Sequence, residues 1–284
     1  MKKTLPKRNS LRKRKSKKKY SVLAKWLGVL AVVLLIGVVG YHYRNGLAYY
    51  LGYKTDSMRK TEAEEKRLSD VRNFQILTKY KHKAAGIDVS EYQGKIVWDS
   101  MKNTETNFPI SFVFIRATVG KDRPDAKFSE NWEKAKQQNI LRGAYHYYRP
   151  NENSLDQAAL FIKTVKLQKG DFPPVLDIEQ MPKNQPLDSL KVGLKRWLHK
   201  VEKHYGVKPI IYSGENFYNA VLKEEFAGYD FWIANYNFFA ETIRDEWQFW
   251  QFTEKGTVSG IEGAVDINVF NGNLAALRQI TIKK

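Results

Sequence analysis

Cysteine is absent from this chain of 284 residues. Its absence excludes a disulfide scaffold, a metal site with cysteine ligands and a thiol nucleophile. The histidines do not suggest a metal site, because His199 and His204 are five residues apart and His146 has no ligand partner near it in the sequence. No serine stands in a nucleophile-elbow motif, although a Ser-His-Asp triad stays open at this level. We therefore expect neither a metal nor a cofactor.

Acidic residues are absent from residues 1–25, which contain twelve of the 48 Lys and Arg residues. The net charge of +18 would by itself favour a nucleic acid or an anionic surface as partner. Residues 84–284, however, contain 26 basic and 25 acidic residues and are close to neutral. The surplus of positive charge thus lies mainly at the N-terminus, and we predict no nucleic-acid partner.

Charge of either sign is absent from residues 26–40, and Lys25 is the only charge in the apolar segment 22–43. As a helix with a rise of about 1.5 Å per residue, this segment spans a bilayer core of about 30 Å. The basic residues before it place the N-terminus in the cytoplasm. The alternative is a cleaved signal peptide, whose apolar region has about 7–15 residues. We favour an uncleaved, single-pass signal anchor in the cell membrane, preceded by a basic cytoplasmic tail (1–21) and followed by an extracellular region.

Residues 44–83 are rich in charge and lack a sustained apolar stripe. This composition predicts a stalk or linker, formed either by a solvated helix or by extended chain.

Residues 84–284 alternate apolar strand-like runs with amphipathic segments. Eight strands are predicted at 85–90, 111–118, 141–148, 173–179, 208–213, 229–235, 246–252 and 264–270. Helical stripes follow at Leu155–Val165 and Leu187–Tyr205. Buried parallel strands separated by helices favour an α/β fold, a (β/α) TIM-like barrel. The last connections are too short for helices, so we expect an irregular barrel, preceded by a single transmembrane helix.

Four acids interrupt the apolar strands at or near their ends: Asp88, Asp177, Glu179 and Asp266. Catalytic side chains of barrels lie at the C-terminal ends of the strands. Asp177 and Glu179 are two residues apart, so they project to the same side and push their pKa values apart. One protonated and one ionised carboxyl group are what glycoside cleavage needs. The alternative for a single acid of this kind is a local ion pair.

Aromatic and amide side chains near other strand ends are candidates for sugar binding. Aromatic rings stack on sugar faces, and the alternative for each ring is ordinary core filling. The candidates are Tyr145, Tyr147, Tyr212, Trp232 and Tyr236, with Gln251 and Asn235 as hydrogen-bonding groups.

Eight motifs between residues 84 and 275 resemble those of glycoside hydrolase family 25, the Chalaropsis-type lysozymes. They are GIDVSEYQG, FVFIRATVG, RGAYHYY, PPVLDIE, PIIYSG, WIANY, WQFT and AVDINVFNG, in that order. The resemblance implies a modified (β/α) barrel that hydrolyses the β-1,4 bond between N-acetylmuramic acid and N-acetylglucosamine in peptidoglycan. Val97 departs from the family pattern, which often has an acid there.

The same resemblance implies roles for the four acids. Glu179 is similar to the family's general acid/base. Asp177 is similar to the acid beside it, which either attacks as nucleophile or positions the N-acetyl group of the substrate. Asp88 and Asp266 resemble the aspartates of the first and last strands that line the cleft.

Three hypotheses follow. The first is a membrane-anchored muramidase whose partners are peptidoglycan glycan strands. The second is a non-catalytic peptidoglycan-binding scaffold on the same fold, and loss of a cleft acid would be its signature. The third, a nucleic-acid-binding protein, rests only on the total charge. We favour the first, because all four acids are present.

Overall fold

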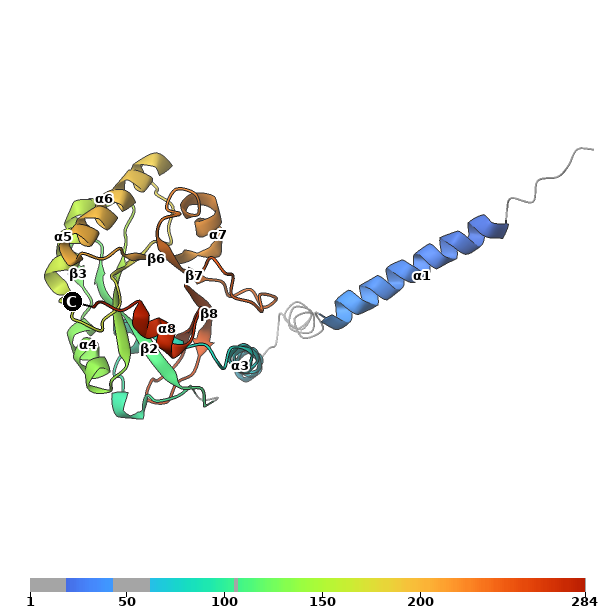
Figure 1. Cartoon of the computed structure of the whole chain (residues 1–284), viewed down its shortest axis with the longest axis horizontal. Coiled ribbons are helices and arrows are strands. Elements are labelled where there is room, and N and C mark those ends of the chain that lie inside the picture. Colours follow the sequence, from blue (N-terminus) through green and yellow to red (C-terminus); the bar gives the residue numbers. More distant parts are fainter. Residues whose placement is uncertain (1–18, 43–61, 105–106, 284) are drawn as a thin grey trace, which may run out of the picture. The chain divides into compact units, whose positions relative to one another are not determined.

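The computed structural model of the chain describes residues 19–42, 62–104 and 107–283 (Figure 1). The chain divides into two compact units, Met1–Met58 and Arg59–Lys284. Residues 1–18 of the predicted cytoplasmic tail, residue 43 of the predicted anchor and residues 44–61 of the predicted stalk lie outside the described residues.

The first unit contains the helix α1 (Lys19–His42), which covers most of the predicted anchor. Its large apolar side chains between Trp26 and Val39 are exposed. Among the described ranges, no helix combines the length and the hydropathy expected of a membrane-spanning segment. The anchor therefore stays a prediction from the sequence.

The second unit is built on a closed barrel of eight strands, as expected. Around the ring these are β1 (Ala85–Val89), β2 (Ile110–Val119), β4 (Leu141–Tyr147), β5 (Val175–Asp177), β6 (Ile210–Gly214), β7 (Asp230–Ala234), β8 (Phe249–Gly256) and β9 (Val265–Phe270). The short strand β3 (Arg123–Pro124) pairs with β2 outside the ring. Each predicted strand is present, although β5 is shorter than predicted and ends at Asp177.

One strand departs from the expected parallel arrangement. β9 is antiparallel to both of its neighbours, β8 and β1, while the other pairs of the ring are parallel. Its first residues therefore lie at the same end of the barrel as the last residues of the parallel strands. This end is the mouth of the barrel, and the reversal brings the start of β9 to it.

Helices cover the outside of the barrel in its first part (Figure 1). They are α4 (Phe128–Gln137), α5 (Ser154–Thr164) and α6 (Leu187–Tyr205), and the last two confirm the predicted helical stripes. Short helical segments are η1 (Glu91–Gln93), η2 (Trp98–Ser100), α7 (Glu215–Phe217), η3 (Tyr218–Leu222) and α8 (Leu274–Gln279). The connections 235–248 and 257–264 contain no helix, which confirms the expected irregularity.

The alternation of side chains along the strands separates two apolar clusters. On β2, Val113 and Ile115 face the helices, whereas Phe112 and Phe114 face the barrel interior. Large rings fill that interior, and we call them the aromatic floor: Phe112, Phe114, Phe172, Trp232 and Phe249. Phe114 stacks on Trp232 with ring centroids 4.5 Å apart. This packing leaves no room for a side chain at Gly86, where a Cβ would lie 2.5 Å from the Phe112 ring.

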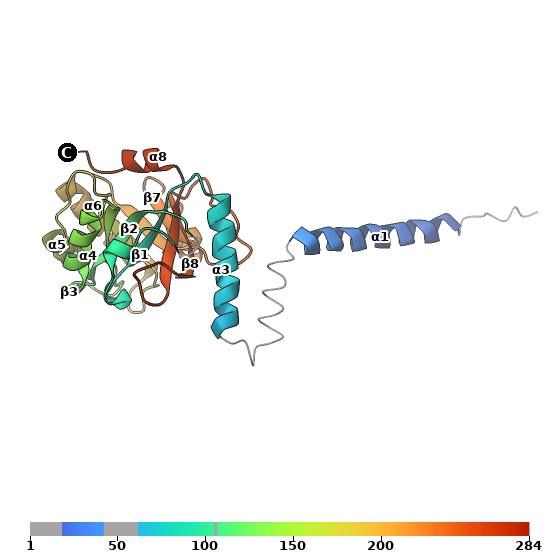
Figure 2. The same cartoon turned by 90° about the horizontal axis from the view of Figure 1, so that it is seen from below.

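The helix α3 (Glu62–Lys79) belongs to the same compact unit as the barrel. It runs along the side of the barrel next to β8 (Figure 2). Ile76 and Leu77 are buried in the outer cluster, and Arg72 is only 8% exposed. The prediction of a solvated stalk up to residue 83 is therefore wrong for α3, because this helix docks through a few buried contacts that form no long apolar stripe.

Candidate active site

A cavity of about 330 Å³ lies at the mouth of the barrel. Of the eleven candidate side chains, all except Asn235 line it: Asp88, Tyr145, Tyr147, Asp177, Glu179, Tyr212, Trp232, Tyr236, Gln251 and Asp266. The alternation of the strands explains this convergence. Val175 belongs to the interior cluster, so Asp177 two residues later points to the same side, and Glu179 follows just beyond the strand.

Asp177 and Glu179 form a coupled carboxyl pair. Burial raises the pKa of Asp177 well above its usual range, and the charge of Glu179 raises it further, whereas the Arg116 charge opposes the shift. Burial also raises the pKa of Glu179, while its hydrogen bond with Asp177 lowers it. Both shifts keep a shared proton on the pair at a pH where an exposed carboxyl group would have lost it.

Asp88 is held by two amide groups rather than by a cation. Its Oδ2 accepts hydrogen bonds from Gln251 Nε2 at 2.8 Å and from Asn268 Nδ2 at 2.7 Å. Burial raises the pKa of Asp88 to about 6, although the two hydrogen bonds lower it, and the charge of Glu179 adds to the rise. Asp88 therefore titrates close to neutral pH.

Asp266 is the residue of β9 that pairs with Asp88 across the β1–β9 ladder. It reaches the cavity because β9 begins at the mouth. Burial raises the pKa of Asp266 to about 9, and the charges of Asp88, Glu254 and Glu179 contribute to the rise. Asp88 and Asp266 therefore both keep their protons at a higher pH than an exposed aspartate does.

The aromatic residues of the cavity fall into two groups. Trp232 and Tyr212 are 1% and 7% exposed, and their rings pack together with centroids 4.4 Å apart. Trp232 donates its Nε1 proton to Asn268 Oδ1 at 2.7 Å, so it positions a partner of Asp88 instead of offering an open face. Tyr236, by contrast, is 41% exposed. Tyr147 is half-buried and accepts a hydrogen bond from Gln180 Nε2 at 3.0 Å.

Gln251 is bonded within the protein at both ends of its amide. Its Oε1 accepts hydrogen bonds from the hydroxyl groups of Tyr212, at 2.7 Å, and Tyr236. Its Nε2 donates to Asp88. The sequence suggested a substrate contact for Gln251, and the structure shows a side chain that orients Asp88.

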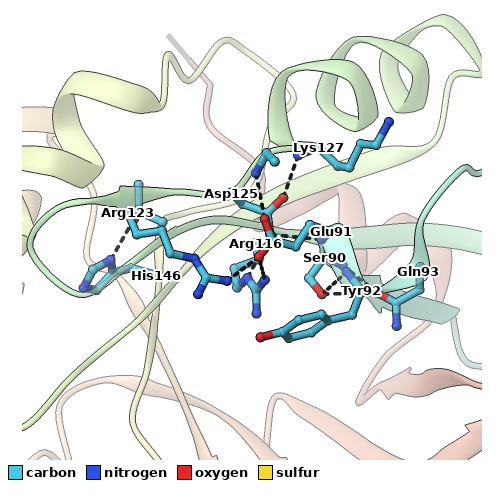
Figure 3. Close-up of polar contacts among 11 residues, drawn as sticks. Ser90, Glu91, Tyr92, Gln93, Arg116, Arg123, Asp125, Lys127 and His146 are labelled. Atoms are coloured by element: carbon cyan, nitrogen blue, oxygen red, sulfur yellow. Dashed lines mark hydrogen bonds and ion pairs between the residues drawn. The ribbon is translucent and has the colours of Figure 1, made fainter.

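Arg116 is a cavity residue that the sequence reasoning missed. Its Nε donates to Asp125 Oδ2 at 2.9 Å, and its Nη2 lies 3.2 Å from Glu91 Oε1 (Figure 3). The ring of Tyr92 lies over the guanidinium, 4.6 Å from Cζ to the ring centroid. Tyr92 is 74% exposed and also lines the cavity, so it presents its other ring face at the rim.

A second cavity of about 460 Å³ adjoins the first. The two share Glu179, Tyr212 and Tyr236. The second is otherwise lined by the last residues of β6 and β7 and by residues just after them: Gly214, Glu215, Asn216, Ala234, Asn235 and Asn237. Glu179 therefore lies between two hollows. A chain molecule that occupied both would pass this carboxyl group.

Within the described part of the chain, no three His, Asp or Glu side chains are grouped so as to hold a metal ion. The ring of His146 is buried, with Nδ1 2.7 Å from Thr118 Oγ1 and Nε2 3.1 Å from Gln157 Oε1. Burial lowers the pKa of His146 to about 4, so its ring is neutral at pH 7 and serves packing.

Comparison with known proteins agrees with this geometry. The sequence profile of the glycosyl hydrolases family 25 matches residues 87–261. The chain is 38% identical to the uncharacterized protein YegX of Escherichia coli O6:H1, over 93% of this chain and 94% of YegX. It is 34% identical to lysozyme M1 of Streptomyces globisporus, over 68% of this chain and 69% of that lysozyme.

Among solved structures, a family 25 glycosyl hydrolase from Bacillus anthracis superimposes with a TM-score of 0.64 and 32% identity. The match covers 71% of this chain and 95% of the other. Profile, sequence relatives and structure thus agree on one assignment: the chain belongs to family 25 of the glycosyl hydrolases and is a glycosidase.

Proposed function

We propose that this glycosidase is a muramidase, which hydrolyses the β-1,4 bond between N-acetylmuramic acid and N-acetylglucosamine in peptidoglycan. The observation that carries the proposal is the Asp177–Glu179 pair, in which Asp177 is buried and Glu179 is exposed at the junction of two adjoining cavities. A glycan that occupies both cavities has sugars on either side of Glu179, which is the arrangement that cleavage within a chain requires. The similarity to lysozyme M1 supports the same substrate.

In the proposed reaction Glu179 is the general acid and base. It gives a proton to the glycosidic oxygen as the bond to the anomeric carbon breaks, and later takes a proton from the attacking water. Asp177 either attacks the anomeric carbon or holds the N-acetyl group of the substrate while that group attacks.

The other cavity residues are assigned to substrate positioning. Asp88 and Asp266 line the cleft beside the reacting pair, and the exposed parts of Tyr147 and Tyr236 contact sugar rings. Tyr145, Tyr212, Trp232 and Gln251 shape the cavity and hold these groups in place.

The test uses the full chain and purified peptidoglycan. We expect release of reducing ends that carry N-acetylmuramic acid, identified by mass spectrometry. Glu179→Gln should lower kcat by about 10²–10⁴-fold, because a carboxamide cannot transfer the proton. Release of N-acetylglucosamine reducing ends, or undiminished activity of Glu179→Gln, would overturn the assignment.

We further propose that residues 22–43 anchor the enzyme in the cell membrane, with the N-terminus in the cytoplasm and the catalytic barrel outside. The support is the apolar segment after a basic tail, and the exposure of the apolar side chains of α1 between Trp26 and Val39. The expected result is recovery of the full chain in the membrane fraction, with release by detergent but not by alkaline carbonate. A new N-terminus beyond residue 38 in the recovered protein would favour the cleaved signal peptide.

A further inference from the structure

Helix α3 precedes the region matched by the family profile, which begins at residue 87, yet it contacts the backbone beside the cleft. The buried guanidinium of Arg72 donates from Nη1 to the carbonyl oxygen of Phe252 at 2.6 Å and from Nη2 to that of Asn237 at 3.0 Å. These two carbonyl groups belong to different segments of the chain. Arg72 therefore fixes the middle of β8 and the connection that follows β7 to one another.

Both carbonyl groups directly follow a residue that lines the cleft. Phe252 comes after Gln251, and Asn237 comes after Tyr236. The Tyr236 hydroxyl donates to Gln251 Oε1, and Gln251 Nε2 donates to Asp88 Oδ2 at 2.8 Å. Arg72 thus holds the backbone next to Tyr236 and next to Gln251. These two side chains are bonded to each other, and Gln251 is bonded to Asp88.

Lys79, the last residue of α3, and Tyr80, which follows it, hold the rest of the connection between β7 and β8. Lys79 Nζ donates to the Glu241 carbonyl oxygen at 2.8 Å, and the Tyr80 hydroxyl accepts a hydrogen bond from the Ile243 amide at 3.0 Å. Residues 235–248 contain neither helix nor strand, so their positions depend on contacts from elsewhere. Residues 72–80 supply several of these contacts.

We propose that α3 is a positioning element of the active site, and that Arg72 is its main positioning residue. Without the guanidinium, two carbonyl groups that it satisfies lose their donor, so residues 235–243 and the middle of β8 are released from one another. Tyr236 and Gln251 then no longer meet in a fixed geometry, and Asp88 loses part of its orientation. The effect on turnover rests on the proposed function, whereas the effect on the backbone does not.

The experiment compares full-chain Arg72→Gln, Arg72→Lys and Arg67→Gln. Arg67 is an exposed arginine on the same helix and serves as the matched control. Hydrogen–deuterium exchange followed by mass spectrometry reports on residues 235–243 and 251–253 independently of activity. Hydrolysis of peptidoglycan, measured as kcat, KM and the pH profile, reports on the site.

We expect Arg72→Gln to speed exchange in both segments and to lower kcat/KM about tenfold, with a shifted pH profile. Arg72→Lys should recover part of both effects, because an ammonium group donates to one of the carbonyl groups. Arg67→Gln should match the original chain. If Arg72→Gln does not fold, Lys79→Gln, at an exposed contact, should speed exchange at 241–243.

If Arg72→Gln folds and hydrogen exchange is unchanged in both segments, the proposal is overturned. If Arg72→Gln does not fold, unchanged exchange at residues 241–243 in Lys79→Gln overturns it. Absence of hydrolysis by the original chain counts against the proposed function alone, because the exchange measurement still decides the role of α3.

Discussion

At the scale of single residues, the cleft is controlled by how its carboxyl groups are buried. Asp88 has amide donors in place of a cation, and Asp266 faces it across the β1–β9 ladder. Burial is the largest cause of the raised pKa at each of them. Such a site favours carboxyl groups that keep their protons, which is useful to an acid catalyst and costly to folding at high pH.

This cost can be measured with Asp266→Asn. The folded state raises the pKa of Asp266 from 3.8 to about 9, so it binds more protons than the unfolded state between these values. Its contribution to stability is complete below pH 4 and is lost as the pH rises toward 9. Asp266→Asn should therefore raise the free energy of unfolding at pH 8 by at least about 1 kcal/mol and change it little at pH 4.

Chemical unfolding at the two pH values checks this prediction. The exposed Asp230→Asn on β7 is the control and should show no such difference between pH 4 and pH 8. An equal effect of Asp266→Asn at both pH values would contradict the prediction.

The residues of the cleft were largely predictable, but their roles were not. Acids inside apolar strands were visible because burial of a charge is costly. Arg116 was missed because the site candidates were acidic, aromatic and amide side chains and included no basic one, although Arg116 continues the inward face of Phe112 and Phe114 on β2. The bond from Trp232 to Asn268 joins residues 36 positions apart and leaves no local signal in the sequence.

At the scale of the element, the strands pack around the aromatic floor so closely that glycine is required. A methyl group at residue 86 would lie 2.5 Å from both the ring and the carbonyl oxygen of Phe112. We expect Gly86→Ala to lower the free energy of unfolding by about 1–3 kcal/mol, because the backbone oxygen cannot move without displacing β2.

Urea unfolding compares Gly86→Ala with Gly228→Ala, whose added methyl group would meet only Lys208 Nζ at 3.9 Å. The control should change stability by no more than a few tenths of a kcal/mol. Equal midpoints for the two variants would show that the interior is less tightly packed than described.

Elements were predictable where periodicity specifies them. The bounds of α6 agree with the sequence stripe, because its apolar face is long and regular. The direction of β9 was not predictable, because the sequence of a buried apolar strand has the same pattern whether the strand pairs in parallel or antiparallel. The docking of α3 was missed because much of it consists of bonds from side chains to backbone carbonyl groups.

At the scale of the whole molecule, the segregation of charge is the basis for the predicted orientation. Replacing the seven Lys and Arg residues between Arg12 and Lys19 by Gln should reduce the fraction of molecules with an external barrel, since the charge difference across the apolar segment falls. Protease added to spheroplasts of a bacterial expression host measures this fraction. Lys200→Gln with Lys203→Gln on α6 is the control and should leave the fraction unchanged, and equal digestion of all three proteins would contradict the prediction.

The hydrogen bonds around Gln251 all run in one direction. Two tyrosine hydroxyl groups donate to its Oε1, and a half-turn of the amide would place this oxygen against the Asp88 carboxylate, which also only accepts. The two tyrosine hydroxyl groups thus fix the orientation of the amide, and its NH₂ group faces the Asp88 carboxyl group as a hydrogen-bond donor. In Gln251→Glu, a carboxylate of nearly the same shape replaces the amide. The volume of the cleft would be kept, but an acceptor oxygen would face Asp88 in place of the N–H donor.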